Sequence, residues 1–175
     1  MSARRFDDYL KTASAPQSLH NVAKEGNCDE ILQWLNQQQP GQIGAKINTT
    51  DLKGYSPLMY AAYSGHENVV ELLLAHAANP NSSDTSGNSI LMGVAFKGHL
   101  RIAHLLLKAG ANVLQRNSQS QSALDFAHLF GRTEMAQLLG EHAHRETHEQ
   151  HEADEFRNTE SHILEINDSG LPSPV

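Results

Sequence analysis

The sequence predicts an all-α solenoid, in which helix–turn–helix units are stacked and joined by short extended loops. The first observation is a period of 33 residues: the stretch that begins at Asp51 starts again at Asp84 and at Asn117, without a gap. The second is that whole columns of residues recur in these units: Ser56, Ser89 and Ser122; Leu58, Leu91 and Leu124; Gly65, Gly98 and Gly131. A fixed period of this length is typical of repeat architectures.

The unit at 51–83 explains the columns physically. Ser56 is a good N-cap, because its hydroxyl accepts a hydrogen bond from a free backbone N–H of the first turn, and Pro57 at the first helical position loses no hydrogen bond. Gly65 can adopt the left-handed conformation that ends a helix. The apolar residues of 69–74 predict a second helix, and the turn-forming residues 79–81 lead into the next unit.

These columns resemble the ankyrin repeat, whose pattern is Asp-x-x-Gly-x-Thr-Pro-Leu-His, then Ala-Ala-x-x-Gly-His, Val-Val-x-Leu-Leu and Gly-Ala-Asn. The resemblance runs from about Leu19 to Leu139 and is most specific in the units at Asp51 and Asp84. Some motif positions differ, with other residues at the histidine and proline columns: Met59, Met92 and Asp125; Ile90 and Ala123. These departures concern hydrogen bonds between neighbouring units rather than the fold.

The array is predicted to occupy residues 18–140, in units at about 18–50, 51–83, 84–116 and 117–140, after a leader of residues 1–17. The first unit is degenerate and the last carries a polar outer face, as terminal units of repeat arrays do. The first unit also has six extra residues within 36–43, which we expect to form a surface loop.

Two side-chain columns carry specific expectations. We expect Leu58, Leu91 and Leu124 to be buried between adjacent units. We expect His66 and His99, which follow the helix-ending glycines, to form local hydrogen bonds at the start of the second helix rather than to bind metal.

Charge and cysteine content narrow the class of protein. The net charge is −7, yet residues 1–140 are formally neutral, so the segment 141–175 carries the whole imbalance. The absence of a basic face argues against a nucleic-acid-binding module. The single cysteine, Cys28, fits a reducing compartment. The sequence shows no secretory leader and no long apolar run, so we expect a cytoplasmic protein without membrane contact.

No catalytic motif is visible, and we therefore expect no enzymatic activity and no cofactor. Cys28 lies beside two acidic residues, which would not lower its pKa. The tail from Glu141 to Val175 is acidic, rich in histidine and expected to be mostly disordered, although 141–156 has residues that favour extension of the last helix. Four histidines within ten residues, some at helical spacing, offer an alternative function in metal buffering or response: His142, His144, His148 and His151.

The resemblance to ankyrin repeats implies a protein–protein interaction module whose partner lies on the concave face, formed by loop tips and first helices. The matching positions here are Leu52, Lys53, Tyr55, Tyr63, Ser64, Thr85, Ser86, Asn88, Phe96, Lys97, Arg116, Ser118, Gln119, Gln121, Leu129 and Phe130. Aromatic residues and arginine dominate binding hot spots, which favours Tyr55, Tyr63, Phe96 and Phe130. The alternative is that Phe96 and Phe130 only fill the gap between neighbouring first helices. We expect a monomer that binds another protein.

The acidic tail suggests a second hypothesis, in which it lies across the concave face and competes with partners. The basic residues there are Lys53, Lys97 and Arg116. An apolar island from His162 to Ile166 is the part of the tail best suited to docking.

Overall fold

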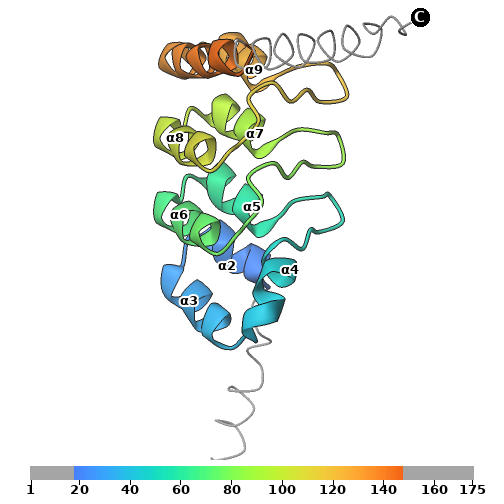
Figure 1. Ribbon diagram of the computed structural model, residues 1–175, viewed down its shortest axis with the longest axis vertical. Helices are drawn as coiled ribbons and strands as arrows, with labels where there is room; N and C mark the ends of the chain where they lie inside the picture. Colours follow the sequence, from blue (N-terminus) through green and yellow to red (C-terminus); the bar gives the residue numbers. More distant parts are fainter. Residues whose placement is uncertain (1–17, 148–175) are drawn as a thin grey trace, which may run out of the picture.

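The computed structural model describes residues 18–147 as a stack of helical hairpins, with loops projecting along one side (Figure 1). The leader and the segment 148–175, including the apolar island, lie outside the described residues. In chain order the elements are α2 (Leu19–Glu25), α3 (Cys28–Asn36), the 3-10 turn η1 (Pro40–Gln42), α4 (Ile43–Ile47), α5 (Pro57–Ser64), α6 (Glu67–Ala75), α7 (Ile90–Lys97), α8 (Leu100–Lys108), α9 (Ala123–Leu129) and a helix that begins at 133.

Two helical layers make up the array. The first helices, α2, α5, α7 and α9, pack on one another in order, and the second helices α3, α6 and α8 form the other layer (Figure 1). Within the described residues no strand is present, and a single bridge pairs Ser83 with Ser89. The fold is therefore the predicted all-α solenoid.

The serine column caps the first helices, as predicted. The hydroxyls of Ser56, Ser89 and Ser122 each accept a hydrogen bond from the backbone N–H three residues on, at 3.2 Å. The residues that replace the motif histidine join these caps in two units. Met92 accepts the Ser89 N–H through its sulfur at 3.3 Å, and Asp125 accepts the Ser122 N–H at 2.8 Å. The departures from the motif thus preserve the helix starts.

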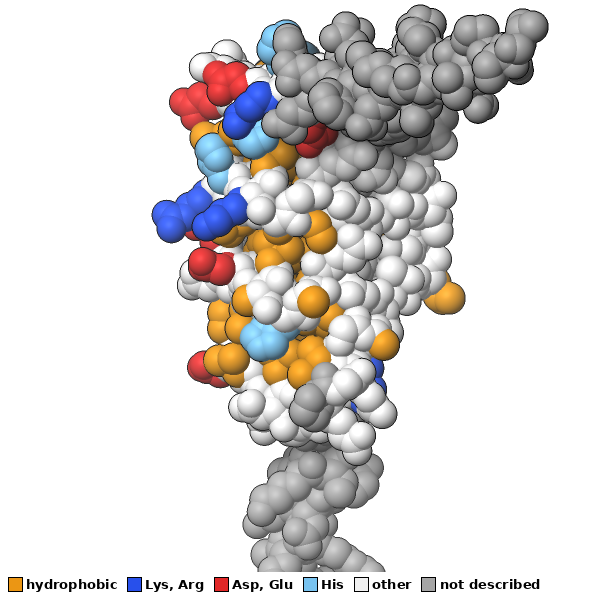
Figure 2. All heavy atoms as spheres, in the orientation of Figure 1, with side chains coloured by type: hydrophobic (Ala, Val, Ile, Leu, Met, Phe, Trp, Pro, Cys, Tyr) orange, Lys and Arg blue, Asp and Glu red, His pale blue; other side chains and the backbone are white. Residues whose placement is uncertain are grey.

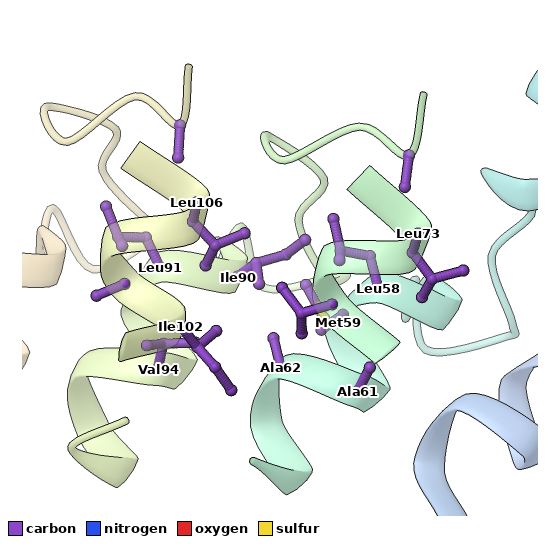
Figure 3. Close-up of a cluster of buried hydrophobic side chains, with 14 of the residues drawn as sticks. Leu58, Met59, Ala61, Ala62, Leu73, Ile90, Leu91, Val94, Ile102 and Leu106 are labelled. Atoms are coloured by element: carbon purple, nitrogen blue, oxygen red, sulfur yellow. The ribbon is translucent and has the colours of Figure 1, made fainter. Parts of the chain in front are cut away.

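The leucine column forms the core in two of its three positions. Leu58 and Leu91 are 0% and 1% exposed and occupy equivalent places in successive hairpins, beside Leu73 and Leu106 (Figure 3). The expectation was wrong for Leu124, which is only partly buried against the core. Its helix, α9, belongs to the last hairpin, so no further first helix packs over it.

The residues that follow the helix-ending glycines connect adjacent units. His66 Nε2 donates to the carbonyl oxygen of Lys24 in the preceding unit at 2.9 Å, so the expectation of a purely local bond was wrong. Arg132 repeats the arrangement, with its Nε donating to the Phe96 carbonyl at 3.3 Å. The ring of His99 lies over Gly65 of the unit before it. Each of these side chains covers the turn between two helices of its neighbour.

Asparagines form a second connection between units. Asn48 accepts the Asn79 N–H at 2.7 Å and donates to the Ala77 carbonyl at 3.1 Å. One period later, Asn81 accepts the Asn112 N–H at 2.7 Å and donates to the Gly110 carbonyl at 3.0 Å. The next position in this column is Leu114, which has no amide to offer, and the last unit has no following loop to hold.

Replacing Asn81 with alanine is expected to lower the free energy of unfolding by about 1–2 kcal/mol, because two partly solvated hydrogen bonds between units are lost. Urea denaturation followed by circular dichroism measures this. Asn68→Ala on the exposed face of α6 is the matched control, since the Asn68 side chain makes no hydrogen bond within residues 18–147, and it should change stability little. Equal losses in both variants would show that the asparagine column does not join the units.

Both ends of the array depart from the regular unit. The insertion within 36–43 lies at the surface, as expected, but its end forms η1 and leads directly into α4. Ile47 at the end of α4 is fully buried. At the other end, the last helix continues from 133 through 147, so the first seven residues of the predicted tail are helical. No helix in residues 18–147 combines the length and apolar character needed to cross a membrane.

Candidate functional site

An apolar groove of about 480 Å³ runs across the first helices α5, α7 and α9 beside the loops. We call it the aromatic groove. Its lining residues come from all four units: Lys24, Tyr55, Met59, Tyr60, Tyr63, Ser64, Asp84, Asn88, Ser89, Met92, Gly93, Phe96, Phe126 and Phe130. The stacking of the units therefore creates a surface that no single unit has.

Aromatic rings follow one another along this groove. Tyr63 of α5 stacks on Phe96 of α7 with ring centroids 6.2 Å apart, and Phe96 meets Phe130 edge to face at 4.6 Å. Phe126 of α9 lies 6.3 Å from Phe130 and completes the row. Tyr63 and Phe130 remain 45% and 42% exposed, whereas Phe96 between them is half-buried. The row fills the gaps between first helices and still offers aromatic surface to a partner.

A glycine in α7 shapes the centre of the groove. A Cβ at Gly93 would lie 3.2 Å from Cδ2 of the Tyr63 ring, which is closer than side-chain packing ordinarily allows. The absence of a side chain at Gly93 therefore lets the Tyr63 ring lie against α7. Met59 and Met92, both buried, lie below, one turn before the aromatic residues on their helices.

The N-terminal end of the groove is held by a carboxylate network. Asp51 accepts backbone N–H groups of Lys53 and Tyr55 at 2.8 and 2.9 Å and the Tyr60 hydroxyl at 2.7 Å. The bond from Tyr60 is the main cause that lowers the pKa of Asp51, and it raises the pKa of Tyr60 in turn. Burial, above all, raises the pKa of Tyr55, whose ring meets Tyr60 edge to face at 5.5 Å. Both tyrosines thus remain neutral, and the Tyr60 hydroxyl donates to Asp51.

The basic residues near the groove differ in how they are held. Lys97 Nζ lies 4.5 Å from the centroid of the Tyr63 ring, within the range of a cation–π contact. Arg116 donates to the Ser120 carbonyl at 2.6 Å and lies 3.5 Å from Asp125, so it stabilises its own loop.

In Figure 2, charged and histidine side chains gather over the helices at the left, while the loop side at the right is mostly backbone and neutral polar groups.

The structure gathers six of the sequence-predicted residues into the groove: Tyr55, Tyr63, Ser64, Asn88, Phe96 and Phe130. The others lie outside its lining, on loop tips or neighbouring surface: Leu52, Lys53, Thr85, Ser86, Lys97, Arg116, Ser118, Gln119, Gln121 and Leu129. Sequence reasoning missed the residues one helical turn before the aromatics: Met59, Tyr60, Met92, Gly93 and Phe126. Their i, i+3 and i, i+4 spacing to Tyr63, Phe96 and Phe130 was the available signal. It also missed Lys24, Asp84 and Ser89.

The described part of the chain contains no metal site that would support the hypothesis of metal buffering or metal response. Among residues 18–147, no three histidine, cysteine, aspartate or glutamate side chains are grouped as metal ligands. Of the four tail histidines, His148 and His151 lie outside the described residues, so the hypothesis stays a prediction. Cys28 is a free, half-buried thiol on α3.

The family model described as ankyrin repeats, in three copies, matches residues 19–117. The chain belongs to the ankyrin repeat family. Ankyrin repeats mediate contacts between proteins and are generally not enzymes, which supports the interaction class expected from the sequence. The motif departures at Met59 and Met92 lie within the matched residues, whereas Asp125 lies beyond them.

Curated relatives match over a shorter stretch. The chain is 37% identical over 62 residues to osteoclast-stimulating factor 1 of Danio rerio, 41% over 56 residues to that of Monopterus albus and 34% over 64 residues to that of Gallus gallus. These matches cover 35%, 32% and 37% of this chain and 26%, 23% and 29% of the relatives. The chain thus spans about a quarter of the length of these curated relatives.

Proposed function

We propose that this ankyrin repeat protein is a non-enzymatic module that binds another protein through the aromatic groove of its concave face. The observation that carries the proposal is the row of aromatic rings from Tyr63 to Phe130, which crosses three units and remains partly exposed. The groove forms within one chain, so the binding unit is a monomer. A cytoplasmic location belongs to the proposal and is supported by the single free cysteine.

In this proposal, rigid presentation of the aromatic side chains lowers the entropic cost of binding. The rings are held by one another and by capped helices, so little side-chain freedom is lost when a partner docks. Tyrosine and phenylalanine bury a large area with few rotatable bonds, and such aromatics in a desolvated centre carry most of the energy of protein interfaces. The surrounding loop residues, including Lys53, Thr85 and Ser118, would form the polar rim.

The double variant Tyr63→Ala/Phe96→Ala tests this function. A pull-down with the full chain followed by mass spectrometry identifies a partner, and titration calorimetry then measures its affinity. Loss of two central aromatic contacts should weaken binding at least about 30-fold, as hot-spot residues are worth 2 kcal/mol or more. Leu32→Ala is the matched control, because Leu32 is a large apolar residue of the second-helix layer, on α3, 43% exposed and outside the groove lining.

Circular dichroism on both variants separates binding from stability. The Leu32→Ala variant should keep its affinity, and the double variant should keep its helical spectrum and a cooperative melt. An unchanged affinity in the folded double variant would show that the partner uses another surface.

A further inference from the structure

The carboxylates beside the aromatic groove are already satisfied by the protein itself. Asp84 accepts the N–H groups of Ser86 and Asn88 at 2.9 Å through one oxygen and the Asn88 side chain at 2.9 Å through the other. At the preceding loop, Asp51 likewise accepts two backbone N–H groups through one oxygen, and it accepts the Tyr60 hydroxyl through the other. These acids hold the loops in shape, so they offer little to a bound ligand.

The lysines beside the groove are not neutralised. Lys24 lines the groove, is exposed and has no hydrogen-bond or ion-pair partner for its ammonium group among residues 18–147. Among the described residues, the ammonium group of Lys97 contacts only the rings of Tyr63 and Phe96. The groove therefore combines an aromatic floor with two ammonium groups, of Lys24 and Lys97, that can still pair with carboxylates, and this suits a segment of aliphatic side chains accompanied by carboxylates.

One segment of this chain has that chemistry. Residues 160–168 read ESHILEIND, with Ile163, Leu164 and Ile166 between Glu160 and Asp168 and a further carboxylate at 165. The segment contains no lysine or arginine. Its apolar side chains match the groove floor and its charge is opposite to that of Lys24 and Lys97.

The chain is long enough to bring this segment to the groove. Second helices of the array end where the chain turns into its loop, as α8 does at Lys108. The last helix passes the equivalent position, Glu141, and reaches 147, so it continues toward the loop side. The fifteen residues 148–162 span at most about 50 Å when extended. Helices pack about 8–10 Å apart, so Tyr63 lies only about 20 Å along the stack from the last unit.

We infer that residues 160–168 occupy the aromatic groove of their own chain and compete there with the protein partner. The inference rests on the proposed function in that both use the same groove. A short tether holds such a segment at an effective concentration of about millimolar, so even a weak intrinsic affinity fills the groove without preventing a tighter partner from displacing it.

Amide chemical shifts of the full-length chain test the inference without any partner. Ile163→Asp/Leu164→Asp places charges in the apolar part of the segment, and Leu171→Asp makes the same kind of change outside it. The first variant should shift the amide signals of Tyr63, Gly93, Phe96 and Lys97, and added salt should shift the wild-type signals in the same direction as the charges are screened. The second variant should leave those signals unmoved. Groove signals that are identical in both variants and in the wild type would overturn the inference.

Dilution distinguishes the tethered segment from a segment supplied by a second copy. Tethered docking does not depend on protein concentration, so the groove signals should keep their positions over a hundredfold dilution. Signals that move toward those of the Ile163→Asp/Leu164→Asp variant on dilution would overturn docking within one chain. Neither result involves a partner, so the failure of this inference leaves the proposed function intact, and the loss of partner binding in Tyr63→Ala/Phe96→Ala is judged separately.

Discussion

Replacing Leu91 with alanine is expected to lower the free energy of unfolding by about 2–5 kcal/mol. Leu91 is 1% exposed and lies between the hairpins before and after its own, so the cavity left behind is enclosed by the core and only partly collapses (Figure 3). Domains are stable by about 5–15 kcal/mol in total, so this single change removes a large fraction. Urea denaturation followed by circular dichroism at 222 nm measures the loss.

Leu124→Ala is the matched control, since it makes the same substitution in the same column of the repeat. Leu124 is only partly buried in the last unit, and water can replace part of the lost contact, so its loss should be about 1–2 kcal/mol. Equal losses of unfolding free energy at Leu91 and Leu124 would show that the stabilisation by this leucine does not depend on having a hairpin packed on both sides of its own.

Repetition made the fold predictable, because each capping serine and buried leucine has copies that point to the same structure. The sequence was least informative where repetition ends. Leu124 matches Leu58 and Leu91 in its place in the repeat but is less buried than they are. The difference arises because no further first helix packs over the last hairpin. The insertion within 36–43 has no counterpart in the other units, so the repeat pattern did not indicate that η1 and α4 form in this part of the chain.

The groove was predictable in its aromatics but less so in its geometry. In the last unit, the residue equivalent to Tyr63 and Phe96 is Leu129. The row of aromatic rings nevertheless continues through Phe130, one residue later. Leu129 is instead 67% exposed at the end of α9. The residue at which a short helix ends depends on local backbone geometry, which the 33-residue period does not specify. The sequence also could not show which basic residues are available to a partner, since it does not reveal that Arg116 donates to the Ser120 carbonyl of its own loop.

Gly26→Ala is expected to lower the free energy of unfolding by about 1.5–3.5 kcal/mol. Gly26 has a φ of +81°, and an alanine there costs about 1–2 kcal/mol in backbone strain. Its Cβ would also lie 2.5 Å from Nδ1 and 2.7 Å from Cγ of the His66 ring, which must move away and lose its hydrogen bond to Lys24, worth about another 0.5–1.5 kcal/mol. Chemical denaturation of the variant measures the total.

Two further variants separate strain from the contact between units. Gly110 has a φ of +85° with no atom within 4 Å of an added Cβ, so Gly110→Ala should cost only the backbone strain. In a His66→Ala background, Gly26→Ala should likewise cost no more than Gly110→Ala, and the double-mutant cycle then gives the coupling between ring and glycine. If Gly26→Ala costs as much without the ring as with it, the histidine does not join the units. A smaller cost of Gly26→Ala in the His66→Ala background would instead show that the turn between α2 and α3 must remain free of a side chain because the next unit covers it.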